Sequence, residues 1–138
     1  MTRDSYPLFR PLQTRWADND IYGHMNNVVH YSLFDTAVNG WLLEVGLLNL
    51  TDSPTVFLVV ETGCSYAAEL AFPDEIHAGL RVAKIGTSSI RYEVGLFKGD
   101  ASQAAATGHF IHVQVDRVTR RPIPLSDEAR KKLQSIVG

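Results

Sequence analysis

The feature that most constrains this chain is one long helical pattern, after which the sequence alternates with the period of strands. Residues 27–45 carry apolar side chains three and four positions apart, which predicts a single amphipathic helix capped by Asn26 or Asn27. A strand is expected before this helix at 9–17, and a short second helix at 126–137. Between the two helices, strands are predicted at 55–67, 76–85, 90–97 and 104–118.

These patterns predict how the elements pack. A helix with one broad apolar face and strands with one apolar face each can bury both by packing the helix across the concave side of a curved sheet. We therefore predict an α+β fold in which one long helix is wrapped by a curved antiparallel sheet of five to six strands. A chain of 138 residues suits one domain, spanning 1–138. The bare second face and the open edges of such a sheet favour homo-oligomerisation.

Charge and cysteine content narrow the class of protein. The formal net charge is −2, which lacks the basic footprint of a nucleic-acid-binding protein. No apolar run reaches the length needed to cross a bilayer, and the N-terminus shows no signal-peptide core. The lone Cys64 cannot form an internal disulfide, which fits a reducing compartment. We expect a cytoplasmic protein with no nucleic-acid or membrane partner.

The segment most suggestive of chemistry is 16–27, which reads WADNDIYGHMNN. Two carboxylates and a histidine stand just before a helix start, where free N–H groups and the helix dipole can stabilise a developing oxyanion. The pattern Asp-x-x-Gly-His-x-Asn-Asn in this segment resembles the signature of hotdog-fold acyl-CoA thioesterases of the 4-hydroxybenzoyl-CoA thioesterase type. Residues 66, 73–76, 82–89 and 115–122 extend the resemblance in order, so that it covers about 12–125.

The resemblance implies a role for each residue of the signature. Asp20 matches the catalytic aspartate, which acts as nucleophile or general base toward the thioester. The backbone N–H of Asn27 matches the oxyanion donor, and Gly23 matches a glycine that lets the chain turn into the helix. His24 matches a histidine with an orienting or polar role. The residues expected to contact the substrate are Tyr22, Asn26, Lys84, Ser88 and Ser89.

The implied reaction is hydrolysis of an acyl-CoA to the free acid and coenzyme A. One carboxylate and one oxyanion donor can suffice, because a thiolate is a good leaving group. No metal or other cofactor is therefore expected, and coenzyme A enters only as part of the substrate and product. The resemblance also implies a homo-oligomer, a dimer of side-by-side sheets or a tetramer, with the acyl group between subunits.

Coenzyme A phosphates would need cations, because the chain has no phosphate-binding glycine loop. Any single one of these cations is more often an ordinary surface residue than a phosphate ligand. We therefore expect phosphate binding from the set of cations and assign it to no individual residue. The candidates are Lys84, Arg91, Arg117, Arg120 and Arg121.

Three other functions stay open at this point. A thioesterase for acyl carrier protein would receive its acyl group on the same phosphopantetheine arm. A non-catalytic acyl-binding module of the same fold would need no carboxylate beside the thioester, so Asp20 argues against it. A hydratase of this fold would pair an Asp with a His for water addition. The pattern also leaves open the acyl group and whether Asp20 attacks directly.

Several residues with chemical potential are expected to be structural. An EF-hand beginning at Asp18 fails because positions five and twelve lack suitable oxygen ligands, and a capping role for Asp18 is favoured. His109 and His112 should face opposite sides of one strand and cannot chelate a metal together. Cys64 is expected to be a small core residue, and Glu61 a solvated strand residue. Without a Gly-x-Ser-x-Gly elbow, a serine hydrolase is disfavoured.

Overall fold

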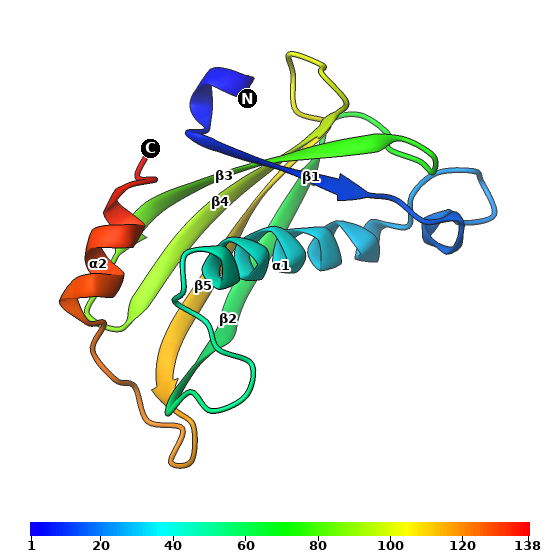
Figure 1. Cartoon of the computed structure of the whole chain (residues 1–138). Helices are drawn as coiled ribbons and strands as arrows, with labels where there is room; N and C mark the ends of the chain where they lie inside the picture. Colours follow the sequence, from blue (N-terminus) through cyan, green and yellow to red (C-terminus); the bar gives the residue numbers. More distant parts are fainter.

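A computed structural model describes residues 1–138 and contains a five-stranded sheet with two α-helices. In chain order the elements are β1 (Leu8–Gln13), α1 (Asn27–Glu44), β2 (Thr55–Tyr66), β3 (Glu75–Ile85), β4 (Ser89–Lys98), β5 (Ala106–Asp116) and α2 (Asp127–Gln134). The strand order is β1-β3-β4-β5-β2, and every neighbouring pair is antiparallel. In Figure 1, α1 crosses one face of the curved sheet and α2 lies at one end of it. The predicted α+β hotdog architecture is confirmed.

Helix α1 begins at a side-chain cap. The Asn26 Oδ1 accepts a hydrogen bond from the N–H of Val28 at 3.0 Å. Inside the helix, Gly40 faces β1, where an added Cβ would lie 3.1 Å from the Arg10 guanidinium. This interior glycine therefore reflects a close approach between helix and strand. Neither helix combines the length and apolar character that a membrane span would need.

The strands bury one face against α1. Along β4, Tyr92, Val94 and Leu96 are fully buried in the core, whereas Arg91 and Glu93 alternate with them and remain half-buried on the other side. We call the side that packs on α1 the inner face and the opposite side the outer face. The predicted alternation along this strand is therefore confirmed.

Two predicted elements extend too far. The strand expected at 9–17 ends at Gln13, and residues Trp16–Asp18 form a 3-10 turn instead. The Asp18 carboxylate accepts a hydrogen bond from the N–H of Arg15 at 2.8 Å, which offers the backbone a local alternative to sheet pairing. The helix expected at 126–137 ends at Gln134, because the chain then turns to bring Val137 beside β3.

Strands β1 and β2 form the two edges of the sheet. Strand β2 is 12 residues long and exposes three consecutive apolar side chains, Leu58, Val59 and Val60. Its register with β5 is interrupted by a bulge between Val59 and Glu61. A long apolar edge with unpaired backbone groups is a surface on which another strand can pair.

Candidate functional site

The signature segment forms a narrow hairpin between β1 and α1. The N–H of Asn26 donates to the Asp18 carbonyl at 2.8 Å, and the N–H of Asp20 donates to the His24 carbonyl at 2.8 Å. The turn at its tip uses Gly23, whose φ of +82° lies in the left-handed region that favours glycine. This hairpin, which we call the signature loop, brings Asp20, Gly23 and His24 together and leads directly into α1.

The Asp20 carboxylate is held by its own loop. Its Oδ1 accepts hydrogen bonds from the N–H of Tyr22 at 2.8 Å and of His24 at 3.3 Å. The residue is exposed, forms no ion pair, and its Oδ2 accepts no hydrogen bond from the chain. The neighbouring His24 ring instead pairs with Glu69, with Nε2 2.9 Å from Oε2. Asp20 therefore presents one carboxylate oxygen with no protein partner.

The first turn of α1 leaves one amide free. The N–H of Val28 is satisfied by the Asn26 side chain, and the N–H of Val29 by the Asn26 carbonyl. The N–H of Asn27 has no acceptor within the chain, and the residue is exposed. The N-cap thus satisfies the neighbouring amides and leaves the Asn27 N–H available as a donor.

Two side chains hold the carbonyl oxygen of Asn27. The Tyr66 hydroxyl, at the end of β2, donates to it at 3.1 Å, and His30 Nδ1 lies 3.2 Å from it. The two rings meet edge to face with centroids 4.7 Å apart. His30 is 4% exposed, and this burial lowers its pKa, so the ring is neutral near pH 7 with Nδ1 as donor.

Asp18 has a different environment from Asp20. It is 2% exposed, and its Oδ1 accepts from the Arg15 guanidinium at 2.7 Å. Both of its oxygens are used within the loop, so the capping role predicted for Asp18 is confirmed. A cavity of about 230 Å³ between β1 and α1 is lined by Arg15 and Asp18, but Asp20 does not line it.

The residues expected to contact substrate fall into two groups. Tyr22 is exposed in the signature loop, and Asn26 caps the helix beside it. Lys84 is near the end of β3, Ser88 is in the β3–β4 turn and Ser89 begins β4, all at the opposite end of the sheet from the signature loop (Figure 1). Because β3 alone has 11 residues, a single chain does not bring these two groups together.

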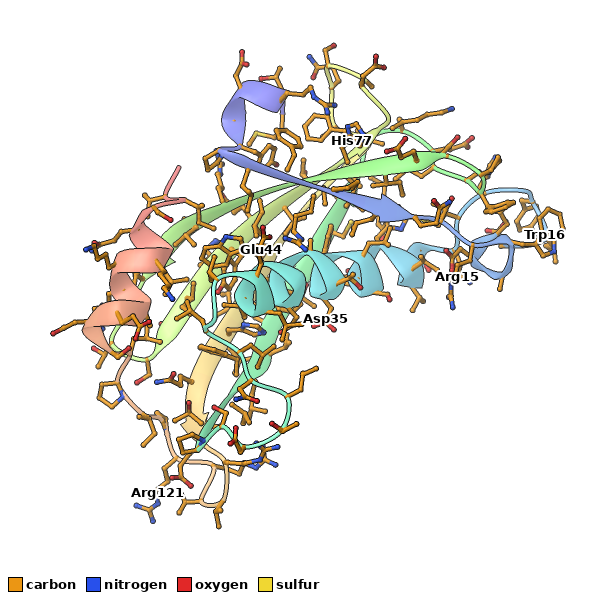
Figure 2. All side chains as sticks on the ribbon, in the orientation of Figure 1. Arg15, Trp16, Asp35, Glu44, His77 and Arg121 are labelled. Atoms are coloured by element: carbon orange, nitrogen blue, oxygen red, sulfur yellow. The ribbon has the colours of Figure 1, made fainter.

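The other candidate cations are also remote from Asp20. Arg91 lies on the outer face, and Arg117, Arg120 and Arg121 lie in the connection from β5 to α2. Figure 2 shows Arg121 at the far end of the molecule from Arg15 and Trp16, which flank the signature loop.

The remaining residues with chemical potential lie away from the signature loop. His112 is buried on the inner face, whereas His109 is on the outer face with Nε2 2.9 Å from the Glu61 carboxylate, so the two histidines do face opposite sides. Cys64 is half-buried, and burial raises the pKa of its thiol. No three His, Cys, Asp or Glu side chains gather into a metal-binding group.

Sequence reasoning missed two members of this site. No motif in the sequence indicates a role for His30, although its position three residues after Asn27 places it one helical turn away. Glu69 lies in the connection from β2 to β3, 45 residues beyond His24 in the sequence, and no local pattern relates them.

Comparison with known proteins shows the family and the fold of the chain. Residues 14–133 match the model of the thioesterase-like superfamily. The crystal structure of the PA5185 protein from Pseudomonas aeruginosa strain PAO1 is 46% identical, covers 99% of this chain and 96% of its own, and superposes with a TM-score of 0.96.

Two more distant structures share the fold. Slr0204 from Synechocystis, a 1,4-dihydroxy-2-naphthoyl-CoA thioesterase, is 16% identical, with 91% of this chain and 94% of its own covered and a TM-score of 0.81. BH1999, a gentisyl-coenzyme A thioesterase, is 22% identical. The match covers 91% of this chain and 99% of BH1999, with a TM-score of 0.81. The family match over most of the chain confirms the resemblance read from the signature. The protein belongs to the thioesterase-like superfamily and is a hotdog-fold thioester hydrolase.

Proposed function

We propose that the protein hydrolyses an acyl-CoA to the free acid and coenzyme A, with Asp20 as the catalytic carboxylate. The observation that carries the proposal is that the signature loop holds a carboxylate with one unpartnered oxygen and leads directly into α1, whose first residue, Asn27, has a free N–H. The first group can attack or activate water, and the second can stabilise the oxyanion that forms. Membership of the thioesterase-like superfamily supports the same reaction.

Two routes are chemically balanced. In one, Asp20 attacks the thioester carbon, the oxyanion collapses with loss of the coenzyme A thiolate, and water hydrolyses the resulting anhydride. In the other, Asp20 takes a proton from the attacking water, and the same thiolate leaves. A single turnover in ¹⁸O-labelled water distinguishes them, because only the first route can place the label in the Asp20 carboxylate.

We further propose that a second copy of the chain completes the substrate site. The exposed β2 edge offers a surface for pairing, and the acyl group would then lie between subunits. Lys84, Ser88 and Ser89 would reach the substrate from the partner subunit, since their own Asp20 is at the other end of the sheet.

The decisive experiment is thiol release by wild type and Asp20→Asn over short, long and aromatic acyl-CoAs. We expect the variant to lose at least about a hundredfold in kcat, the scale of a lost general base or nucleophile. Asp35→Asn is the matched control, because Asp35 is an exposed carboxylate on α1 that contacts only Asn39. Equal activity of Asp20→Asn and wild type, with fold and assembly intact, would refute the assignment.

The same assay separates the alternatives. An acyl carrier protein thioesterase would show a higher kcat/KM for acyl carrier protein than for the matching acyl-CoA. A binding module would retain acyl-CoA without releasing thiol. A hydratase would yield hydroxyacyl-CoA in place of free acid, which chromatography of the product resolves. The acyl panel should include 4-hydroxybenzoyl, gentisyl and dihydroxynaphthoyl groups, since two structurally similar proteins act on aromatic acyl-CoAs.

A further inference from the structure

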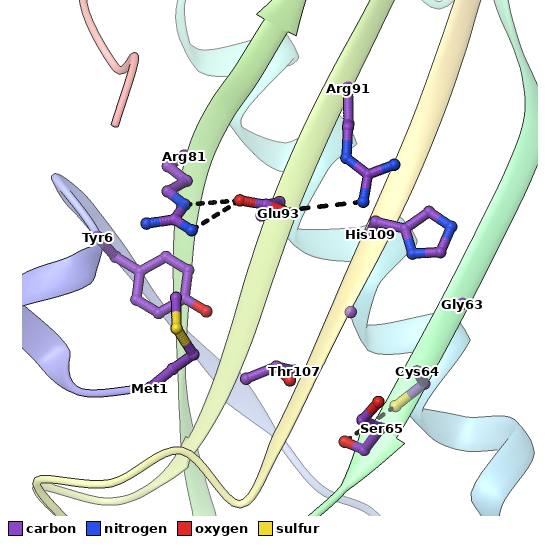
Figure 3. Close-up of a pocket in the computed structure, with 11 residues that line it drawn as sticks. Met1, Tyr6, Gly63, Cys64, Ser65, Arg81, Arg91, Glu93, Thr107 and His109 are labelled. Atoms are coloured by element: carbon purple, nitrogen blue, oxygen red, sulfur yellow. Dashed lines mark hydrogen bonds and ion pairs between the residues drawn. The ribbon is translucent and has the colours of Figure 1, made fainter.

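The outer face of the sheet contains a cavity of about 310 Å³ over β4, β5 and β2 (Figure 3). Glycines lie beside it. A Cβ on Gly63 would lie 2.5 Å from the His109 ring, and a Cβ on Gly95 would lie 2.7 Å from the Tyr6 hydroxyl. Because neither position carries a side chain, the His109 and Tyr6 rings can lie against the strand backbone beside the cavity.

Three hydroxyl groups line one side of this outer-face cavity. Gly95 pairs with Thr107 across β4 and β5, and Thr107 pairs with Ser65 across β5 and β2. The Tyr6 hydroxyl lies over Gly95, so the hydroxyls of Tyr6, Thr107 and Ser65 follow one row across the strands. None of the three makes a hydrogen bond to another group of the chain, so all can bind a ligand.

Two arginines beside the cavity share a single carboxylate. Arg81 Nη2 lies 2.7 Å from the Glu93 carboxylate, and His109 is paired with Glu61. Arg91 comes no closer than 3.8 Å to Glu93, and its guanidinium makes no hydrogen bond within the chain. Glu93 therefore pairs with two guanidinium groups, as the dashed lines in Figure 3 show, and this trio keeps a net positive charge with free donors on Arg91.

We propose that the outer-face cavity binds a small organic oxyanion, a phosphate or carboxylate on a polar body. The guanidinium of Arg91 binds the charged group, because its planar fork matches two oxygens of either anion. The hydroxyls of Tyr6, Thr107 and Ser65 bind the polar body. The cavity volume is at the small end of ligand pockets, which suits a ligand of a few carbon atoms.

This site is separate from the one that holds Asp20. Thr107 and His109 point to the outer face, whereas the neighbouring Gly108 faces α1, where its Cβ would meet Phe34. The sheet therefore stands between the outer-face cavity and the start of α1. The proposal does not depend on the reaction proposed above.

The test is titration of the full chain, in its own assembly, with inorganic phosphate, glycerol 3-phosphate and succinate, followed by amide NMR shifts. We expect saturable shifts at Thr107 and His109 with one anion class preferred, at constant ionic strength set by chloride. Arg91→Ala should weaken binding by at least about tenfold, and the isosteric Thr107→Val by roughly fivefold. Lys131→Ala, which removes an exposed cation on α2, should bind as wild type does.

Three results would overturn the proposal. One is the absence of saturable shifts with all three anions at millimolar concentrations. Another is equal affinity of wild type, Arg91→Ala and Thr107→Val when thermal denaturation shows that both variants are folded. The third is stoichiometric displacement of the bound anion by coenzyme A, which would assign the cavity to the thioester site.

Discussion

Two side chains converge on a single peptide group at the start of α1. Tyr66 and His30 both contact the carbonyl oxygen of Asn27, whose own N–H is the proposed oxyanion donor. Both side chains can affect the reaction without touching the substrate. They fix the position of the residue, and a donor that is already in place costs no reorganisation when charge develops.

Removal of the Tyr66 hydroxyl should therefore affect the chemical step more than binding. We expect Tyr66→Phe to lower kcat by up to about tenfold, in line with the loss of one hydrogen bond, with little change in KM. Steady-state kinetics with a saturating acyl-CoA measure both constants. Thr62→Val is the matched control, since Thr62 is on the same strand as Tyr66 and its hydroxyl donates to the His109 carbonyl of β5. An unchanged kcat, or a change confined to KM, would contradict the positioning role.

The buried residue His112 makes the stability of the fold depend on pH. His112 is 1% exposed among Phe57, Tyr92 and Phe110, its Nδ1 has no hydrogen-bond partner, and burial lowers its pKa to about 4. The folded state therefore resists a proton that the unfolded chain accepts near pH 6.5. The contribution of His112 to the free energy of unfolding is therefore fully present above pH 6.5 and decreases as the pH falls toward 4.

The size of this effect is testable by urea denaturation at several pH values. Wild type should lose up to about 3 kcal/mol of unfolding free energy through His112 between pH 6.5 and 4. His112→Phe keeps an aromatic ring without the titrating group, so its slope over that range should be shallower. Equal slopes in the two proteins would show that other groups set the acid sensitivity.

For individual residues, the sequence indicates which side chains lie close together only where they belong to one short segment. Asp20, Gly23 and His24 come from one short segment of the sequence, and hydrogen bonds within the loop hold them in one hairpin. The sequence could not predict the contact of His24 with Glu69, because that contact depends on how the β2–β3 connection packs against the loop.

Among the elements, edge strand β2 has one side without a pairing strand and an exposed apolar surface. Its backbone pairs with β5 on one side only, and three apolar side chains in succession are exposed. Alternation predicted the strand, but no pattern indicated which strands would be edges, since strand order depends on how the chain crosses over α1. The first strand ends earlier than predicted for a different reason. The Asp18 carboxylate accepts the Arg15 N–H and so competes with pairing in the sheet.

A charge on this edge should disrupt assembly. We expect Val60→Lys to shift the protein toward monomer, because a lysine in a paired edge must be desolvated, and to lower thiol release in parallel. Val118→Lys is the control, since Val118 is 88% exposed and lies beyond the end of β5. Light scattering coupled to chromatography reports the mass. A monomeric Val60→Lys protein with full activity would exclude a shared site.

For the whole molecule, the length of the sheet has a genetic consequence. If one copy provides Asp20 and its neighbour provides Lys84, Ser88 and Ser89, two differently disabled chains can rescue each other. Co-expression of Asp20→Asn with a chain whose Lys84, Ser88 and Ser89 are all replaced by alanine should recover about a quarter of the wild-type rate, because random mixing gives half heterodimers with one intact site each. Failure to exceed the two separate preparations would mean that each chain works alone.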